Sequence, residues 1–366
     1  MTTLPLPRPV KLASLCLLPV LAGLCGCKSI GPKTVARDRY DYSSSISESW
    51  KRQTLLNIVK LRYLDPPIFV DVGQIVAGYS LETGISAGGS LPENGALGGN
   101  TAVLGGSAKF TDRPTITYTP LTGSKFLKGL MTPLPPDAVF FMVQSGWPAD
   151  SVMSAAVAAL NGLKNEASTV DGVAAPDPDF LRVLGLLRKI QLSGAVGLRI
   201  QQDAQKLQTV LLTFRGRNLS DETQGDIREL RQLLGLDLDA DEFKVAFGAT
   251  ASNGRELAVL TRSILHIMGT MAAQVEVSTN DVAQGRATPG LESATGVPDR
   301  QRLVRIRSSK EKPTDAFVAV PYRDQWFWID DRDLKTKRAF AFMMFLFTLA
   351  DTGEKEALPL ITIPAQ

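Results

Sequence analysis

Between residues 75 and 118, small or apolar residues alternate with polar ones. In the first arm the odd positions from Ile75 to Leu91 are mostly apolar or small, and the even positions are mostly Gly, Ser, Gln or Glu. After a turn-rich segment at 92–99, the even positions hold the apolar residues. Successive side chains of a strand point to opposite faces, so this period of two predicts a long amphipathic β-hairpin. The apolar face of the second arm would hold Ala102, Leu104, Gly106, Ala108, Phe110, Ile116 and Tyr118.

Elsewhere the hydrophobic periodicity predicts short helices and strands in mixed order. One helix should begin at Ser45, because Glu48 follows three residues later as in a capping box, and it should stop at Asp65-Pro66-Pro67. Residues 339–350 are strongly apolar, but 12 residues flanked by charge predict a core helix rather than a membrane span, which needs roughly 20. We expect further helices at 124–131, 148–163, 178–192, 221–234, 255–273 and 335–349, and strands at 68–72, 138–143, 197–201, 209–215, 243–250, 302–308, 316–320, 325–329 and 358–363.

The predicted fold class is therefore α+β, with helices and antiparallel strands in two or three domains. Changes in composition suggest where the chain divides: residues 164–177 form a plausible boundary, and residues 278–300 are rich in Gly, Pro, Thr and Asp and should be a loop. The predicted segments are a signal peptide at 1–26, a flexible tether at 27–42, an N-terminal α+β domain with the hairpin at 43–165, a central α/β region at 166–280 and a C-terminal α+β region at 281–366.

The first residues have the layout of a secretory signal. Arg8 and Lys11 are followed by an apolar stretch at 12–24, which is too short to span a bilayer. The sequence Leu24-Cys25-Gly26-Cys27 resembles the lipobox of bacterial lipoproteins, with Leu at −3 and Gly at −1 relative to the modified cysteine. Cys27 is thus the expected lipidation site, whereas Cys25 would have Leu24 at its −1 position.

Two longer stretches, at 30–67 and 318–347, are similar to segments of uncharacterised proteobacterial envelope lipoproteins. The resemblance implies no activity, but it implies a membrane anchor of several acyl chains, which makes attachment durable. Lys28 follows the modified cysteine, where an Asp would be associated with inner-membrane retention. The expected location is therefore the periplasmic face of the outer membrane.

Composition excludes several classes of site. Without Arg8 and Lys11 the chain keeps 38 basic against 37 acidic residues, a balance that argues against a dedicated nucleic-acid binder. The three cysteines are Cys16 and Cys25 in the signal and Cys27, so the mature chain would have neither a disulfide nor a free thiol. His266 is the single histidine, which excludes any site built from two. Common nucleophile, Walker-type and dinucleotide glycine motifs are missing, and we expect no cofactor, no metal and no catalytic residue.

The hairpin has two interpretations. Its apolar face could lie on the core of its own domain, as in many antiparallel sheets, and this is the favoured one. Alternatively, the hairpin could insert into a membrane, since both arms exceed the roughly 9–11 residues of a transmembrane strand. One hairpin leaves unpaired backbone groups in lipid, so insertion would need several copies in a ring. The scarcity of aromatic residues (Tyr79, Phe110 and Tyr118) weakens the second interpretation.

Aromatic and acidic residues meet at 322–333. Paired carboxylates cleave sugars and aromatic faces bind them, so Asp330, Asp331 and Asp333 could serve a cell-wall glycoside hydrolase. The competing interpretation is structural: the aspartates cap a helix, and Trp326 and Trp328 share a strand face that packs in the core.

Two other motifs are weaker. Residues 237–241 imitate half of a calcium loop but lack its Gly and final Glu, and His266 lies in an apolar helix as a core or boundary residue. We therefore expect a lipid-anchored, non-enzymatic protein with a structural, scaffold or binding role, whose partners are the membrane and envelope proteins or further copies. The alternatives are a homo-oligomeric outer-membrane pore or export component built on the hairpin and, with less support, the hydrolase.

Overall fold

The computed structural model describes residues 31–90, 101–169, 172–202, 208–214, 219–288, 290 and 302–350. Its contacts divide the chain into two compact units: Met1–Ser47 with Asp71–Thr119, and Glu48–Val70 with Pro120–Gln366. Helices and mostly antiparallel strands occur together, so the predicted α+β class is confirmed. The predicted signal peptide, Cys27 and the final strand at 358–363 lie outside the described residues.

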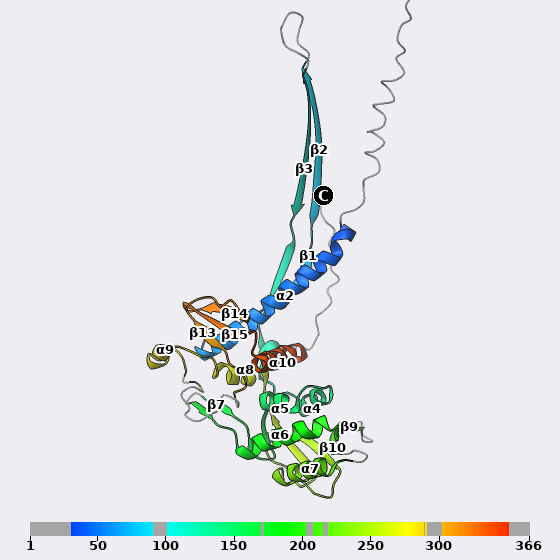
Figure 1. Ribbon diagram of the computed structural model, residues 1–366, viewed down its shortest axis with the longest axis vertical. Coiled ribbons are helices and arrows are strands. Elements are labelled where there is room, and N and C mark those ends of the chain that lie inside the picture. Colours follow the sequence, from blue (N-terminus) through cyan, green and yellow to red (C-terminus); the bar gives the residue numbers. More distant parts are fainter. Residues whose placement is uncertain are drawn as a thin grey trace, which may run out of the picture. The chain divides into compact units, whose positions relative to one another are not determined.

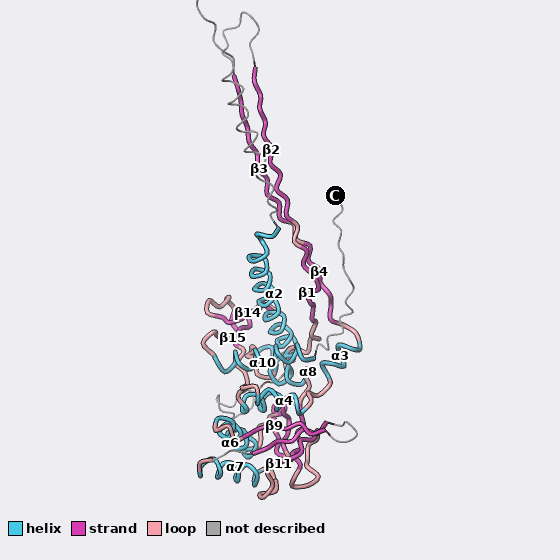
Figure 2. Tube along the Cα trace, turned by 90° about the vertical axis from the view of Figure 1, so that its right-hand side faces the viewer, coloured by secondary structure: helices cyan, strands magenta, loops and turns pink. Residues whose placement is uncertain are grey.

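The first unit is built on the predicted hairpin. Strands β2 (Tyr79–Ser90) and β3 (Thr101–Asp112) pair antiparallel over their whole length, from Tyr79 opposite Asp112 to Ser90 opposite Thr101. Strands β1 (Phe69–Val76) and β4 (Thr115–Leu121) pair as a second two-stranded sheet and continue the ribbon in the same direction, as Figure 2 shows. The Arg113 N–H donates to the Gly78 carbonyl at 2.9 Å where the two pairs meet.

Helix α2 (Gly31–Arg62) contradicts the predicted tether in part, because residues 31–42 are helical. Pro32 lies in the first turn, where proline is tolerated, and the chain has no further proline before Pro66. The predicted helix start at Ser45 is therefore wrong. Glu48 forms ion pairs with Lys51 (2.6 Å) and Arg52 (3.0 Å) on the same helix instead of closing a capping box.

The second unit contains a six-stranded mixed sheet in the order β6-β5-β12-β11-β10-β9, in which only β11 and β12 are parallel. Figure 1 shows α4 to α7 gathered around this sheet. The strands are β5 (Val157–Leu160), β6 (Leu163–Lys164), β9 (Val196–Gln202), β10 (Gln208–Phe214), β11 (Glu242–Phe247) and β12 (Glu256–Thr261); the helices are α3 (Ser124–Met131), α4 (Pro136–Gln144), α5 (Ala149–Ala156), α6 (Pro178–Leu192), α7 (Asp221–Leu233), α8 (Ile264–Ala272) and α9 (Thr279–Ala283).

Several predictions for this unit are wrong in type or extent: the strand predicted at 302–308 is limited to Arg307–Ser309, and the loop predicted at 278–300 contains α9. The apolar run at 138–143 is helical in α4, because Pro136 starts a helix whose first turn carries Asp137. The helix predicted at 148–163 ends at Ala156, and the next residues form β5. The one predicted at 255–273 is strand β12 followed by α8, which Ser263 caps by accepting from the His266 N–H. The boundary region also contains the short strands β7 (Ala167–Thr169) and β8 (Gly172–Ala174).

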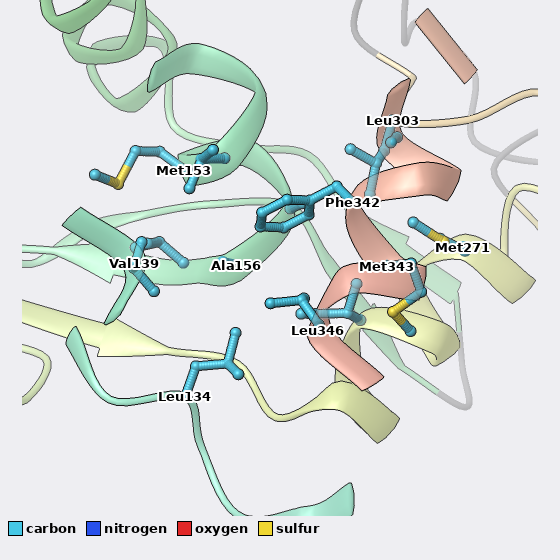
Figure 3. Packing of buried hydrophobic residues seen from close by; sticks show 14 of the residues in the cluster. Leu134, Val139, Met153, Ala156, Met271, Leu303, Phe342, Met343 and Leu346 are labelled. Carbon is cyan, nitrogen blue, oxygen red and sulfur yellow. The ribbon is translucent and has the colours of Figure 1, made fainter. Parts of the chain in front are cut away.

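The C-terminal segment of this unit adds a three-stranded sheet, β13-β15-β14, and helix α10 (Leu334–Ala350). Its strands are β13 (Arg307–Ser309), β14 (Ala316–Tyr322) and β15 (Gln325–Asp330). Phe342, Met343 and Leu346 of α10 are buried, and Figure 3 shows them among side chains of α4, α5 and α8. The prediction of an apolar core helix is thus confirmed. Among the described helices, none is both long and apolar enough to cross a membrane.

Candidate functional site

The hairpin register places the apolar residues of both arms on one face. Leu81 lies opposite Phe110, and Ala87 lies opposite Leu104, because odd positions of β2 meet even positions of β3. Residues directly opposite in an antiparallel pair share a face. The apolar face, as the term is used below, therefore consists of Leu81, Thr83, Ile85, Ala87, Gly89, Ala102, Leu104, Gly106, Ala108 and Phe110.

Among the described residues of the first unit this face is largely exposed, so that unit offers no core for the apolar face to cover. Leu81 (51 % exposed), Ile85 (86 %), Leu104 (81 %) and Phe110 (54 %) are all open to solvent. Within the described residues, β2 pairs with β3 alone and both strands keep an unpaired outer edge. Isolated two-stranded hairpins are only marginally stable in water, and exposed apolar patches often mark interaction sites, so this ribbon is the candidate functional element of the first unit.

The opposite face, called the polar face below, carries small, hydroxyl-bearing and charged residues and one large apolar residue, Val103, which is 68 % exposed. Its members include Ser80, Glu82, Ser86, Ser107 and Lys109, and Lys109 lies 3.7 Å from Glu82 directly across the strands. Both side chains of this ion pair are about two-thirds exposed, so the pair contributes about 1 kcal/mol at most. The Glu82–Lys109 ion pair identifies the polar face as the one that is suited to contact with water.

Aromatic side chains gather at the end of the hairpin that adjoins β1 and β4. The rings of Tyr79 and Phe110 stack with centroids 6.0 Å apart. The Tyr79 hydroxyl donates to the carboxylate of Asp38 on α2, and this hydrogen bond raises the pKa of Tyr79. Residues 31–47 of α2 and the hairpin belong to the same unit, and the Tyr79–Asp38 hydrogen bond joins them at the aromatic end of the hairpin.

The strand length matches a membrane. Each arm has 12 residues, which at about 3.3 Å per residue gives roughly 40 Å. Transmembrane strands tilt by about 40°, so the same arm crosses about 30 Å, which is the thickness of a hydrocarbon core.

The aspartates at 330–333 are structural in their contacts. Asp330 accepts the Arg332 N–H at 2.9 Å and ion-pairs with the guanidinium groups of Arg332 and Arg307, and these contacts hold its pKa below the usual range. A proton-donating carboxyl in a glycosidase needs a raised pKa instead. Asp333 accepts from the Thr336 N–H at 3.0 Å at the start of α10, which confirms the capping interpretation for this residue. Asp331 ion-pairs with Lys337 at 2.7 Å.

The neighbouring tryptophans share a face of β15, as predicted, but it is not the core face. Phe327 and Ile329 point into the core with no exposed surface, because they pair with Val320 and Val318 of β14. Trp326 and Trp328 are half-buried on the other side. The Arg307 guanidinium lies 5.2 Å from the Trp328 ring, and Lys312 lies 5.6 Å from that of Trp326.

A buried polar cluster joins β12, α8 and the segment before β13. The guanidinium of Arg262 donates to the carbonyls of Ser154 and Glu166, and burial lowers the pKa of Arg262 to about 10. The Glu166 carboxylate accepts from Gln274 at 2.9 Å, and the Gln274 Oε1 accepts from the Val304 N–H at 2.9 Å. Every partner lies within the protein, so the cluster is a structural connection rather than a site.

The remaining sequence candidates do not converge. His266 is exposed on α8 rather than part of the core. Asp237 accepts from Arg255, and Asp241 lies 3.7 Å from Arg231 on α7. Over the part of the chain that the structure describes, no three His, Cys, Asp or Glu side chains are grouped to hold a metal ion. Sequence reasoning missed a group of arginines around Asp330, although Arg302, Arg305 and Arg307 lie close together in the sequence and Arg332 is two residues from Asp330.

Comparison with protein-family models, with curated proteins and with solved structures finds no match for this chain.

Proposed function

We propose that the protein is a lipid-anchored component of the outer membrane, facing the periplasm, whose β2–β3 hairpins insert into the bilayer from several copies and form a pore. The observation that carries this proposal is the exposed apolar face of the hairpin. The apolar side chains of Ile85 and Leu104 are exposed to water, which is energetically unfavourable, and no described residue of the first unit buries them. Burial in lipid would stabilise them by roughly 25 cal/mol for each Å² of apolar surface removed from water.

The two faces of the hairpin suit two different environments. Small, hydroxyl-bearing and charged residues on the polar face can line a water-filled interior, and the apolar face can contact lipid. This alternation favours an inserting hairpin over one that binds a soluble protein, because such a partner would not need the opposite face to be mostly polar or small, with Val103 as its one large apolar residue.

The unpaired strand edges require further copies. An open edge in hydrocarbon leaves backbone N–H and C=O groups without partners, at several kcal/mol each. The outer edge of β2 in one copy can pair with the outer edge of β3 in the next, which is a head-to-tail contact that closes when a ring forms. The partner is therefore another copy of this chain.

The expected lipid anchor fits the same arrangement. Cys27 precedes the start of α2 by four residues, a reach of about 14 Å at most. Asp38 follows seven residues later, about 10 Å along a helix, and contacts Tyr79 at the aromatic end of the hairpin. Acyl chains on Cys27 and the aromatic pair Tyr79–Phe110 can thus occupy the same membrane surface, where aromatic residues are enriched.

A second candidate is a lipoprotein with a structural or binding role whose hairpin stays out of the membrane. The abundance of small residues on the apolar face favours it, because Ala87, Gly89, Ala102, Gly106 and Ala108 offer little surface to lipid. The hydrolase is the least supported alternative, since Asp330 is held ionised by arginines.

The deciding experiment compares lysine substitutions on the two faces of the hairpin. Ile85→Lys with Leu104→Lys places charge on the apolar face, at a cost of roughly 2–4 kcal/mol for each lysine near the bilayer centre. Ser86→Lys with Ser107→Lys adds the same charge to the polar face and is the matched control. We expect the first pair to abolish conductance in planar bilayers and the high-mass detergent-extracted particle, and the control pair to retain both.

A wild-type protein that is monomeric and non-conducting would contradict the pore and leave the binding role. An equal loss of conductance and of the high-mass particle in both pairs of variants would show that the apolar face is not the one that contacts lipid.

A further inference from the structure

The polar face of the hairpin carries charged side chains at a single level. Among the described positions of this face, only Glu82 and Lys109 are charged, and they lie directly opposite each other with the Lys109 Nζ 3.7 Å from the Glu82 Oε2. The other positions are uncharged: Ser80, Gly84, Ser86, Gly88, Ser90, Thr101, Val103, Gly105, Ser107 and Thr111. One level of the hairpin therefore presents all the full charges of the described polar face.

This charged level lies close to the aromatic end of the hairpin. Glu82 follows Tyr79 by three residues, which at about 3.3 Å per residue places it roughly 10 Å along the strand. In a strand tilted by about 40°, that corresponds to a depth of roughly 8 Å in a hydrocarbon core of about 30 Å. In the proposed pore the level therefore lies near one mouth, on the side of the expected lipid anchor.

The two side chains are placed to act on ions in the lumen. Lys109 is 68 % exposed and Glu82 is 69 % exposed, so a passing ion would meet both without displacing other protein groups. A unit charge about 4 Å away changes the local concentration of an ion by roughly fivefold in water. Substitutions on the lumen face of a membrane barrel accordingly tune its selectivity.

A ring of copies would cancel these charges. In the proposed ring, β2 of one copy adjoins β3 of the next, so carboxylate and ammonium groups alternate around the lumen and each copy contributes one of each. Channels that select one sign of ion carry rings of like charge instead. An alternating ring favours neither sign, whereas the loss of one partner would leave a ring of like charges.

We propose that the alternating Glu82 and Lys109 side chains set the charge selectivity of the pore, and that their balance lets polar solutes of either sign pass. The inference rests on the proposed function and specifies which class of solute the pore transmits. Lys109→Gln leaves one carboxylate in each copy, and Glu82→Gln leaves one ammonium group. Both side chains are largely exposed, so neither substitution removes core packing.

The test measures reversal potentials of the full-length protein in planar bilayers across a KCl gradient, with the dilute side near 0.1 M. We expect a ratio of K⁺ to Cl⁻ permeability close to one in the wild type. Lys109→Gln should raise this ratio by about threefold or more, and Glu82→Gln should lower it by about as much. Both shifts should shrink at about 1 M KCl, where the Debye length falls from about 10 Å to about 3 Å.

Three controls separate the ring from other causes. The exchanged variant Glu82→Lys with Lys109→Glu keeps the alternation and should retain the wild-type ratio. Arg182→Gln and Glu229→Gln, tested singly, remove the same charges from an exposed ion pair of the second unit and should also leave the ratio unchanged. Ser86→Lys with Ser107→Lys adds positive charge to the polar face without removing the pair, and should shift the ratio towards Cl⁻.

The outcomes distinguish this inference from the proposed function. A wild-type protein that does not conduct would contradict the pore, and the inference would fail with it. A conducting wild type in which the two single substitutions shift the ratio in the same direction, or not at all, would overturn the inference and leave the pore. Equal shifts in the single variants and in those of the second unit would overturn it as well.

Discussion

Glu166 is a buried carboxyl whose titration should be visible in the stability of the protein. Burial raises its pKa above the ordinary 4.5, against the opposing effects of the Gln274 hydrogen bond and the charges of Arg262 and Lys335. The native state then binds more protons than the unfolded state at pH values just above 4.5, so the free energy of unfolding falls as pH rises through the raised pKa. The stabilisation from the protonated form is complete only at lower pH.

Glu166→Gln should remove this dependence, because the amide stays neutral and can still contact Gln274. We expect the melting temperature of the wild type to fall more steeply than that of the variant between pH 4.5 and neutrality. Titration of His266 is common to both proteins and cancels in the comparison. The control Glu222→Gln, at a side chain that is 81 % exposed, should follow the wild type. Parallel curves for Glu166→Gln and the wild type would contradict the prediction.

At the scale of elements, α10 holds the second unit together through one buried stripe. Leu346 is fully buried on it, whereas Phe345, the preceding residue, is 55 % exposed. Leu346→Ala should lower the free energy of unfolding by about 2–5 kcal/mol, since it removes buried methyl groups and leaves a cavity. Phe345→Ala deletes a larger side chain but should cost less, because much of that side chain is already in water. Chemical denaturation of both variants measures the difference, and equal losses would show that α10 is not packed as in Figure 3.

The sequence predicts elements well where one period is sustained. The alternation at 75–118 was sufficient to predict the hairpin and its two faces, which the pairing of Leu81 with Phe110 confirms. The alternation could not predict what the apolar face contacts. Hydrophobic periodicity shows that one face of a strand is more apolar than the other, but it does not show what covers that face. The run at 138–143 shows the opposite case: six apolar residues fit a buried strand or a buried helix equally, and the prolines before them decided for α4.

The arginines around Asp330 show why the surroundings of a candidate residue can escape sequence reasoning. Attention to Asp330 and Asp333 suggested acid catalysis, but the lowered pKa of Asp330 comes from Arg332 and Arg307. Arg332 is next to these aspartates in sequence, whereas Arg307 is brought to them only by the antiparallel pairing of β13 with β15. A charge balance taken over the whole chain does not show which charged residues become neighbours in the fold.

At the scale of the whole molecule, the division into two units predicts that assembly and core stability are separable. The ribbon offers a clean place to test this, because the Gly78 carbonyl and the Arg113 N–H are already hydrogen-bonded across it. Replacing residues 79–112 with Asn-Gly should close β1 and β4 with a two-residue turn and remove the hairpin.

The shortened protein should melt at the temperature of the wild type, because the buried cluster from Leu55 to Phe347 contains no residue of β2 or β3. Its detergent-extracted mass should fall to that of a single chain, and conductance should be lost, because the strands that pair between copies are gone. Near-ultraviolet circular dichroism together with light scattering measures both properties on one sample. An unchanged oligomer would place the contact between copies in the second unit. A molten core would show that the hairpin supports the fold of the second unit. Either outcome would contradict the proposal that the hairpin, with its exposed apolar face, is a separable assembly element.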